Sequence, residues 1–183
     1  MFARTARLML RPGWPEDANA LTQAIAHHDV VDKLARAPWP YALGDAQFFL
    51  QPERGAEAAN FLVFDDPGGA PRLVGGIGID APNAAGEREL GYWFTPHAWG
   101  RGYATEAGRA VVQIARHALG LRRLHSGHFT DNPASGAVLR KLCFQPTGAI
   151  VPRRSVARGA EVPCALYELD LAATDCGPMQ LAA

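Results

Sequence analysis

The sequence predicts a mixed α/β fold, because short extended runs alternate with runs of helical periodicity. The clearest example begins with the run Glu89–Phe94, which has the alternation of a strand. A glycine-containing segment, Trp99–Ala107, follows it and leads into a helical pattern from about Thr105 to Leu119. With 183 residues the chain has the length of one domain with a proper core. We therefore expect a single domain over residues 1–183, with its core at residues 5–171 and a loose tail at residues 172–183.

The other elements follow from the same signals, taken in chain order. Leu21 and Ile25 lie one turn apart in a helix that Pro15 begins, and Asp45 is placed to cap the next helix. Strands are predicted where apolar runs lie between turns rich in Gly, Pro and Asn. The predicted strands are Ala6–Arg11, Asn60–Asp65, Arg72–Ile79, Glu87–Phe94, Arg123–Thr130, Thr147–Arg154 and Val162–Leu171. The predicted helices are Glu16–His27, Ala46–Arg54, Thr105–Leu119 and Ala134–Leu142.

Charge and cysteine usage argue against several classes of function. The chain has 18 basic and 18 acidic residues, so its formal net charge is zero. No face is obliged to meet an anionic polymer or lipid, and we expect neither nucleic acid nor a membrane as partner. The three cysteines are widely spaced and the histidines lack ligand spacing, so we expect no metal. The N-terminus lacks the continuous apolar stretch of a secretory signal, and we expect a cytoplasmic protein.

The joint at Trp99–Ala107 has the features of a phosphate cradle. The N-terminus of a helix presents backbone N–H groups without a partner inside the helix, and the helix dipole adds positive charge there. Gly100, Gly102 and Ala104 keep side chains out of the way of an anion. The alternative is an ordinary strand–turn–helix joint with glycines that serve only the turn. The segment lacks both the nucleoside-triphosphate motif and the dinucleotide fingerprint, which requires a third glycine at the position of Thr105.

Three segments together resemble a known family. They are Thr5–Arg11, Trp99–Ala107 and Asp131–Phe144, in that order. They are similar to the GNAT superfamily of N-acetyltransferases, and more narrowly to the branch that acetylates the N-termini of ribosomal proteins. The resemblance implies a GNAT-like mixed, mostly antiparallel central sheet of about six to seven strands, flanked by helices, with a splay between the two central strands. It also implies a monomer or a small homodimer.

The resemblance further implies acetyl-coenzyme A (acetyl-CoA) as cosubstrate, with its pyrophosphate on the glycine-containing loop. The family's last two small positions fall on Gly102 and Ala104, so the backbone amides of Arg101, Gly102, Tyr103, Ala104 and Thr105 are implied to bind phosphate. The side chain of Arg101 either adds a contact to phosphate or points to water. Trp99 stands where the superfamily has Gln or Arg, a departure that the ribosomal-protein branch shares.

Two further positions are implied to bind the cosubstrate at the splay. A backbone N–H near Phe94 would face the thioester carbonyl and stabilise the oxyanion. Asn132 matches an Asn that binds the pantetheine amides, whereas its alternative role is to cap the following helix. Gly91 lies in the same strand, and a strand glycine often marks the close approach of a ligand.

Glu89 and Ser135 are the candidate catalytic residues. An amine must lose a proton before it attacks, and a carboxylate at Glu89 is a suitable base; the alternative is an ion pair that is structural or orients the substrate. Many family members carry a helix Tyr that returns a proton to the thiolate, and Leu139 stands at that position here. The ribosomal-protein branch is implied to use a Ser where Ser135 stands. Ser135 then either serves the thiolate, as a proton donor or a hydrogen-bond donor, or is a plain first-turn serine.

The acceptor pocket is predicted in the loops. Trp39 and Tyr41 lie where this branch builds one wall, and the alternative is that they form a small satellite core. The segment Ser155–Gly159 would be the other wall, and Ser155 replaces a Glu that the branch can carry there as a base. This replacement favours Glu89 as base and weakens a ribosomal protein as acceptor.

Two functions of different classes remain open at this level. The first is an enzyme that moves acetyl from acetyl-CoA to a primary amine, on a protein N-terminus or a small molecule, by direct attack in a ternary complex. The second is a coenzyme-A-binding sensor or partner module without turnover. A third and weaker possibility is a phosphate-binding fold of another kind. Glu89 and Ser135 favour the enzyme, whereas the phosphate cradle and Asn132 fit both of the first two.

Overall fold

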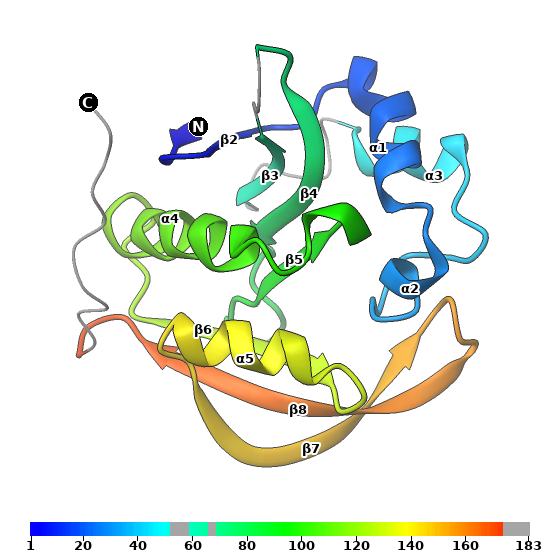
Figure 1. Ribbon diagram of the computed structural model, residues 1–183. Coiled ribbons are helices and arrows are strands. Elements are labelled where there is room, and N and C mark those ends of the chain that lie inside the picture. Colours follow the sequence, from blue (N-terminus) through cyan, green and yellow to red (C-terminus); the bar gives the residue numbers. More distant parts are fainter. Residues whose placement is uncertain (52–58, 66–68, 174–183) are drawn as a thin grey trace.

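The computed structural model describes residues 1–51, 59–65 and 69–173 as helices, strands and the loops between them (Figure 1). The strands are β1 (Ala3–Arg4), β2 (Leu8–Arg11), β3 (Ala59–Asp65), β4 (Arg72–Ile79), β5 (Leu90–Phe94), β6 (Arg123–Phe129), β7 (Gln145–Ser155) and β8 (Ala160–Asp170). The α-helices are α1 (Ala18–Ile25), α2 (His28–Val31), α3 (Leu43–Phe49), α4 (Tyr103–His117) and α5 (Pro133–Lys141). Short 3-10 turns occupy Pro15–Asp17 and Pro96–Ala98.

The strands form two sheets, and the strands within each sheet are antiparallel. One sheet has the order β1-β2-β3-β4-β5 and the other the order β6-β8-β7. Between β5 and β6 the described residues form a single isolated parallel bridge, Glu89 with His125. Beyond that bridge the Ser126 hydroxyl donates to the Leu90 carbonyl at 2.8 Å, and no further ladder pairing follows. The predicted splay is therefore confirmed and lies between β5 and β6.

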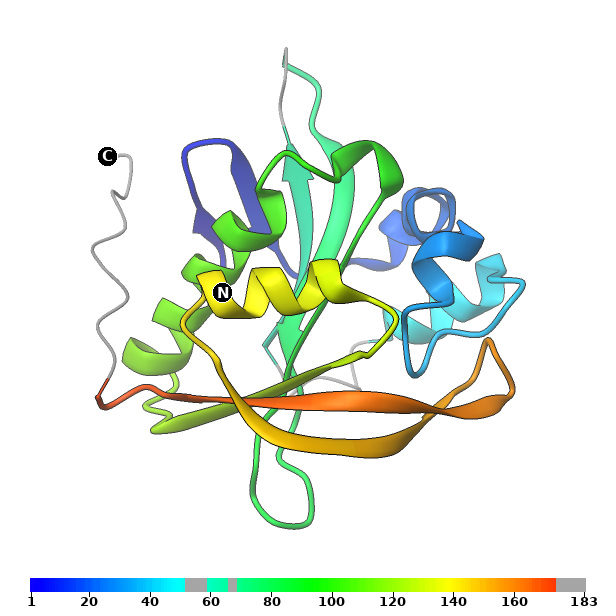
Figure 2. The ribbon, with the colours of Figure 1, turned by 60° about the horizontal axis from the view of Figure 1, so that its bottom comes forward.

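Helices cover both faces of the larger sheet, and the alternation of β3 shows how. Phe61 and Val63 belong to a core that includes residues of α4 and α5, whereas Leu62 and Phe64 belong to a second core with residues of α1, α2 and α3. Successive side chains on a strand point to opposite faces, so one strand supplies both cores. Figures 1 and 2 show α4 and α5 on one side of the sheets and α1, α2 and α3 on another.

The described residues form eight strands in two sheets, where about six to seven strands in one sheet were expected. The difference at the N-terminus has a local cause. The predicted strand Ala6–Arg11 begins only at Leu8, because a turn precedes it in which the Thr5 N–H donates to the Leu8 carbonyl at 2.9 Å. The Thr5 hydroxyl closes this turn by accepting from the Leu8 N–H at 3.0 Å. The two residues of β1 then pair back on β2.

Helix boundaries also differ from those predicted. The predicted helix Glu16–His27 divides into a 3-10 turn and α1, and α2 was not predicted. Asp45 is not the N-cap of α3: it lies in the first turn, and its carboxylate accepts from the N–H of Ala42, the N-cap residue, at 2.8 Å. Residues 52–54, at the predicted end of that helix, and residues 174–183, in the predicted tail, lie outside the described residues.

Candidate active site

The edge of β5 that faces β6 offers backbone groups to a ligand. The Asp80 N–H donates to the Glu89 carbonyl at 3.0 Å, and the Thr95 N–H donates to the Val74 carbonyl at 2.9 Å, so odd-numbered residues of this strand bond towards β4. Along a strand the backbone groups point alternately to one neighbour and the other. The N–H groups of Tyr92 and Phe94 therefore point into the gap between β5 and β6. The Phe94 N–H thus faces the gap, as its predicted role towards the thioester requires.

Trp99 supports this edge from the loop after β5. Its indole Nε1 donates to the Phe94 carbonyl at 2.8 Å. The Phe94 carbonyl points to the same side as the Phe94 N–H, and the indole fixes the peptide group between Phe94 and Thr95 in orientation. A Trp at this position thus has a structural role that the sequence pattern did not reveal.

The N-terminus of α4 has the geometry of an anion cradle. Gly102 is the N-cap residue with φ of +78°, and Gly100 has φ of +73°. Both lie in the left-handed region, where glycine is favoured. No atom of the described residues lies within 4 Å of a Cβ built at Gly100, and among them only Arg7 Nη2, at 3.6 Å, lies that close to one built at Gly102. The first-turn N–H groups of Tyr103, Ala104 and Thr105 thus begin the helix beside open space.

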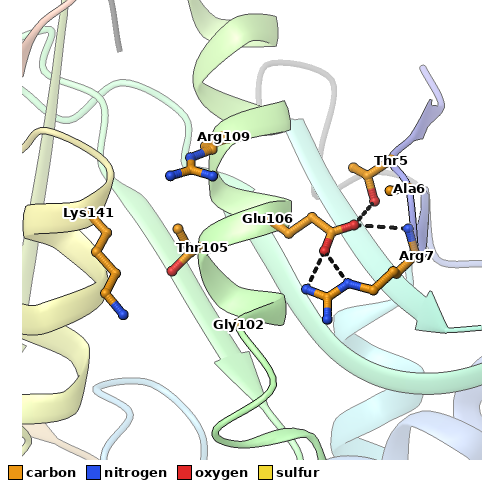
Figure 3. A pocket seen from close by; sticks show the side chains of 8 residues that line it. All are labelled: Thr5, Ala6, Arg7, Gly102, Thr105, Glu106, Arg109 and Lys141. Carbon is orange, nitrogen blue, oxygen red and sulfur yellow. Dashed lines mark hydrogen bonds and ion pairs between the residues drawn. The ribbon is translucent and has the colours of Figure 1, made fainter. Parts of the chain in front are cut away.

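A cavity of about 400 Å³ lies at this helix end (Figure 3). It is lined by residues of the β1–β2 turn, of α4 and of the end of α5, which are Thr5, Ala6, Arg7, Gly102, Thr105, Glu106, Arg109 and Lys141. Arg109 and Lys141 form no ion pair with any residue in the part of the chain that the structure describes, and the same holds for Arg101. Arg109 and Lys141 thus bring to this cavity two cations without an ion-pair partner among the described residues, in a chain whose net charge is zero. The cavity is thus suited to a polyanion.

Glu106 is the one acid of this cavity, and the β1–β2 turn neutralises it. Its carboxylate accepts from the Thr5 hydroxyl at 2.6 Å, from the Arg7 N–H at 3.0 Å and from Arg7 Nε at 2.7 Å. Burial acts to raise the pKa of Glu106, but these hydrogen bonds outweigh it and hold the pKa below its usual value. The Arg7 guanidinium also donates to the Arg101 carbonyl at 3.0 Å. Arg7, which was predicted to lie in the first strand, thus contributes to the site from the turn that precedes β2.

At the N-terminus of α5, Asn132 and Ser135 lie where the sequence predicted. The Asn132 Oδ1 accepts from the Ser135 N–H at 3.3 Å, so Asn132 does cap the helix. Capping uses the carbonyl oxygen and leaves the amide N–H₂ to donate to a ligand. The Ser135 Oγ lies 2.8 Å from the hydroxyl of Tyr92 on β5, and that hydroxyl also donates to the Ser135 carbonyl at 3.0 Å. Leu139, one turn further on, is fully buried.

Glu89 precedes β5 and forms an ion pair that spans the two sheets. Both of its carboxylate oxygens accept from the guanidinium of Arg153 on β7, at 3.1 Å for the longer contact. This hydrogen bonding raises the pKa of Arg153. The pair lines a second cavity, of about 290 Å³, together with Arg36, Asp80 and Glu87. A role for Glu89 as base therefore requires this pair to open when an amine enters.

The predicted walls of the acceptor pocket differ in character. Trp39 is 42% exposed and stacks edge-on against His28, with ring centroids 5.1 Å apart. Tyr41 packs against the core of α1, α2 and α3, and burial raises its pKa to about 12. Ser155 is fully buried, and its hydroxyl donates to the Leu34 carbonyl at 3.2 Å. Tyr41 and Ser155 thus have structural contacts, whereas Trp39 remains open to a ligand.

The space beside Gly91 is open on the face of β5 that carries Glu89 and Trp93. No described atom lies within 4 Å of a Cβ built on it, and the residue is exposed. Packing within the protein therefore does not require glycine here, and the space is available to a ligand.

The sequence did not predict a role for Tyr92, Arg109 or Lys141, nor the partner of Glu89. Arg153 pairs with Glu89 across the two sheets, and no sequence pattern connects these two residues. Arg109 follows Thr105 by one helical turn, which is the signal that would have found it. No sequence signal connects Lys141 or Tyr92 to their neighbours. Within the described residues there is no group of three or more potential metal ligands, and no helix is long and apolar enough to cross a membrane.

Comparisons with known proteins agree with this geometry. Residues 7–145 match the Acetyltransferase (GNAT) domain family. The chain is 40% identical over 79 residues to an uncharacterized N-acetyltransferase, YoaA, of Bacillus subtilis, an alignment that spans 43% of this chain and 45% of that relative. In the solved structures, a putative ribosomal-protein-serine acetyltransferase from Vibrio cholerae aligns with a TM-score of 0.75 and 25% identity, over 93% of this chain and 97% of that one.

A second solved structure carries the coenzyme. It is the ribosomal L7/L12 alpha-N-protein acetyltransferase RimL in complex with coenzyme A, with a TM-score of 0.78 and 20% identity over 95% of this chain and all of that one, a likeness of fold alone. The domain match and the N-acetyltransferase relative favour catalysis over a coenzyme-A-binding module without turnover. The chain therefore belongs to the GNAT family of acetyltransferases, whose domain makes it an acetyl-CoA-dependent acyltransferase.

Proposed function

We propose that this protein transfers the acetyl group of acetyl-CoA to a primary amine, on a protein N-terminus or a small molecule, by direct attack in a ternary complex. The observation that carries the proposal is the positive end of α4. There, left-handed glycines expose first-turn N–H groups beside Arg109 and Lys141. An electroneutral chain that gathers at a helix N-terminus two cations with no ion pair among the described residues is suited to the phosphates of a coenzyme.

The cosubstrate is proposed to run from this cavity into the gap between β5 and β6. The backbone N–H groups from Arg101 to Thr105 bind the pyrophosphate, and Arg109 and Lys141 add charge-assisted contacts. The amide of Asn132 donates to the pantetheine arm. The Phe94 N–H donates to the thioester carbonyl, and a donor of this kind is worth about 3 kcal/mol in the barrier.

The amine is proposed to enter past Gly91, on the face of β5 that carries Glu89 and Trp93. Glu89 is proposed to take its proton, directly or through water, once the amine displaces Arg153 from the carboxylate. Trp39 is proposed to contact the acceptor, whereas the buried contacts of Tyr41 give it a supporting role. Holding amine and thioester together in this geometry is worth roughly 7–11 kcal/mol of the barrier.

The cosubstrate site is tested by a pair of variants that differ only in charge. Thr105 lies in the first turn of α4 and lines the cavity. Thr105→Glu puts a carboxylate beside the proposed phosphates, whereas Thr105→Gln has the same shape without the charge. Both side chains are well tolerated at this helix position, so folding is preserved.

Calorimetric titration with acetyl-CoA is the measurement. We expect Thr105→Glu to weaken binding at least about tenfold, because the added charge repels the phosphates, and Thr105→Gln to stay within about threefold of the wild type. Equal affinities of the two variants for acetyl-CoA would show that its phosphates do not bind in this cavity. Thiol release from acetyl-CoA in the presence of short peptides or of spermidine then identifies the class of amine, and no release with any amine would refute amine acetylation.

A further inference from the structure

Tyr92 brings a phenol to the N-terminus of α5 from the neighbouring strand. Its ring packs against the core that α4 and α5 cover, and its backbone borders the gap between β5 and β6. Among the described residues its hydroxyl hydrogen-bonds to Ser135 alone, once to the carbonyl oxygen and once to Oγ. Burial raises the pKa of the phenol to about 12, so Tyr92 keeps its proton at physiological pH.

The Tyr92 proton has two acceptors within reach. The Ser135 carbonyl oxygen lies at 3.0 Å and the Ser135 Oγ at 2.8 Å. When the phenol donates to the carbonyl, its oxygen can accept the Ser135 hydroxyl proton. When the phenol instead donates to Oγ, the Ser135 hydroxyl proton must point elsewhere, because the two oxygens cannot both place a proton on the line between them. Rotation of one O–H bond thus turns Ser135 from a donor to Tyr92 into a donor to a ligand.

We propose that Tyr92 is a positioning residue for the departure of the coenzyme thiolate: it holds the Ser135 Oγ and, by donating to it, directs the Ser135 hydroxyl proton at the sulfur. This inference rests on the proposed function above, which places the pantetheine arm in the gap. The side chain one turn after Ser135 is the buried, apolar Leu139, so α5 supplies no phenol of its own there. The strand supplies it instead.

The step balances without ionisation of either hydroxyl. The nitrogen–carbon bond forms, the carbon–sulfur bond breaks, and the electron pair of that bond goes to sulfur. The proton lost by the amine goes to Glu89 or water, and the thiolate takes a proton from water after release. An alkyl thiol such as that of cysteine has a pKa of about 8.5, so a proton stays on a phenol as weakly acidic as Tyr92. The pair therefore stabilises the thiolate by a hydrogen bond and not by proton transfer.

The proposal predicts how the thiol of bound coenzyme A titrates. A hydrogen bond to the thiolate lowers the pKa of the thiol, and loss of that bond raises it. The ultraviolet absorbance of the thiolate is measured against pH with coenzyme A bound to the wild type, Tyr92→Phe, Ser135→Ala and the double variant. Tyr167→Phe is the matched control, because its buried hydroxyl accepts from Arg140 and not from Ser135.

We expect the thiol pKa to rise in Tyr92→Phe and in Ser135→Ala, to rise no further in the double variant, and to be unchanged in Tyr167→Phe. With acetyl-CoA and any active amine, kcat falls about tenfold in Tyr92→Phe, the loss of one hydrogen bond to a charged group, while the Kd of acetyl-CoA and the melting temperature stay close to those of the wild type. An unchanged titration in Tyr92→Phe, or losses in kcat that add in the double variant, overturns the role of Tyr92 but leaves the proposed function standing. Failure of the wild type to bind coenzyme A overturns the proposed function as well.

Discussion

At the scale of single residues, the ion pair of Glu89 with Arg153 decides how the proposed base can act. The guanidinium occupies both carboxylate oxygens, and each side chain is about one-third exposed, at 33% for Glu89 and 32% for Arg153. An incoming ammonium is a cation that can compete with Arg153 for this carboxylate. The need for a base depends on the acceptor, because an α-amine has a pKa near about 8 whereas a lysine-type amine has one near about 10.4.

Glu89→Gln separates a base from an orienting pair. If Glu89 removes a proton from the amine, the loss of kcat/KM in the variant shrinks as pH rises towards the pKa of the amine, because the amine then arrives neutral. We expect a loss of at least about tenfold at pH 7 that diminishes by pH 9, and a larger loss for a lysine-type amine than for a peptide N-terminus. The measurement is a pH profile of kcat/KM for both amines, with Glu161→Gln as an exposed control. A loss that is constant across this range would assign Glu89 to orientation of the substrate.

At the scale of elements, the cavity at α4 depends on a contact between segments about a hundred residues apart in sequence. The β1–β2 turn places Thr5 and Arg7 on the carboxylate of Glu106, whose side chain is 17% exposed. This contact neutralises the one acid of the cavity and leaves its net charge positive. The same turn sends the Arg7 guanidinium to the loop that carries Gly102. The N-terminal hairpin and the helix thus form the cavity jointly.

Glu106→Gln should show this contact as a pH-dependent loss of stability. The pKa of Glu106 is lowered in the folded state, so its contribution is present above the unfolded value of about 4.3 and is lost as pH falls through the folded value. We expect the free energy of unfolding to fall by about 2 kcal/mol at pH 7, with a difference from the wild type that narrows below about pH 4. Urea unfolding at several pH values measures this, and the exposed Glu161→Gln is the control. A difference independent of pH would mean that the carboxylate charge is not the cause.

At the scale of the whole molecule, the long β7–β8 hairpin connects the two cores. Figure 2 shows its turn reaching the side where α2 lies, and there the Val156 N–H donates to the Ala35 carbonyl at 2.9 Å. Arg158, in the same turn, bonds both to Asp32, after α2, and to Asp131, before α5. Lys33 completes a ring of two cations and two carboxylates. This ring fixes the turn at Ser155–Gly159, one predicted wall of the acceptor pocket, to the segment after α2 that leads to the other predicted wall at Trp39.

Arg158→Met should loosen the contact between the two predicted walls of the acceptor pocket while leaving the cosubstrate site intact. We expect the KM of the acceptor to rise about tenfold, because a misplaced wall misplaces the amine, and the Kd of acetyl-CoA to stay unchanged. Hydrogen bonds from Arg158 and then Lys33 hold the pKa of Asp131 below its usual value, so the stabilisation is present above about pH 4 and disappears as pH falls further. The melting temperature should fall by about 2–4 °C at pH 7 and by less at low pH. Arg154→Met, at an exposed position of β7, is the control, and a weaker binding of acetyl-CoA in Arg158→Met would contradict this division of roles.

The sequence by itself determined the local features of this protein. The glycines around Arg101, the alternation of Glu89–Phe94 and the cap at Asn132 are local signals, because backbone conformation and side-chain period depend on near neighbours. Together with the resemblance of three segments to a family, they predicted the fold class, most strands and the left-handed glycines before α4. Boundaries were less well predicted where a side chain competes for a backbone group, as Thr5 and Asp45 do.

Only the tertiary structure decided which of these residues work together. Arg153 meets Glu89, Tyr92 meets Ser135, and Arg109 and Lys141 share a cavity, although each partnership joins different strands or helices. Such partnerships depend on the register between strands and on where the β5–β6 pairing ends. These are long-range quantities set by the packing of the whole chain, and no periodicity in a single sequence records them.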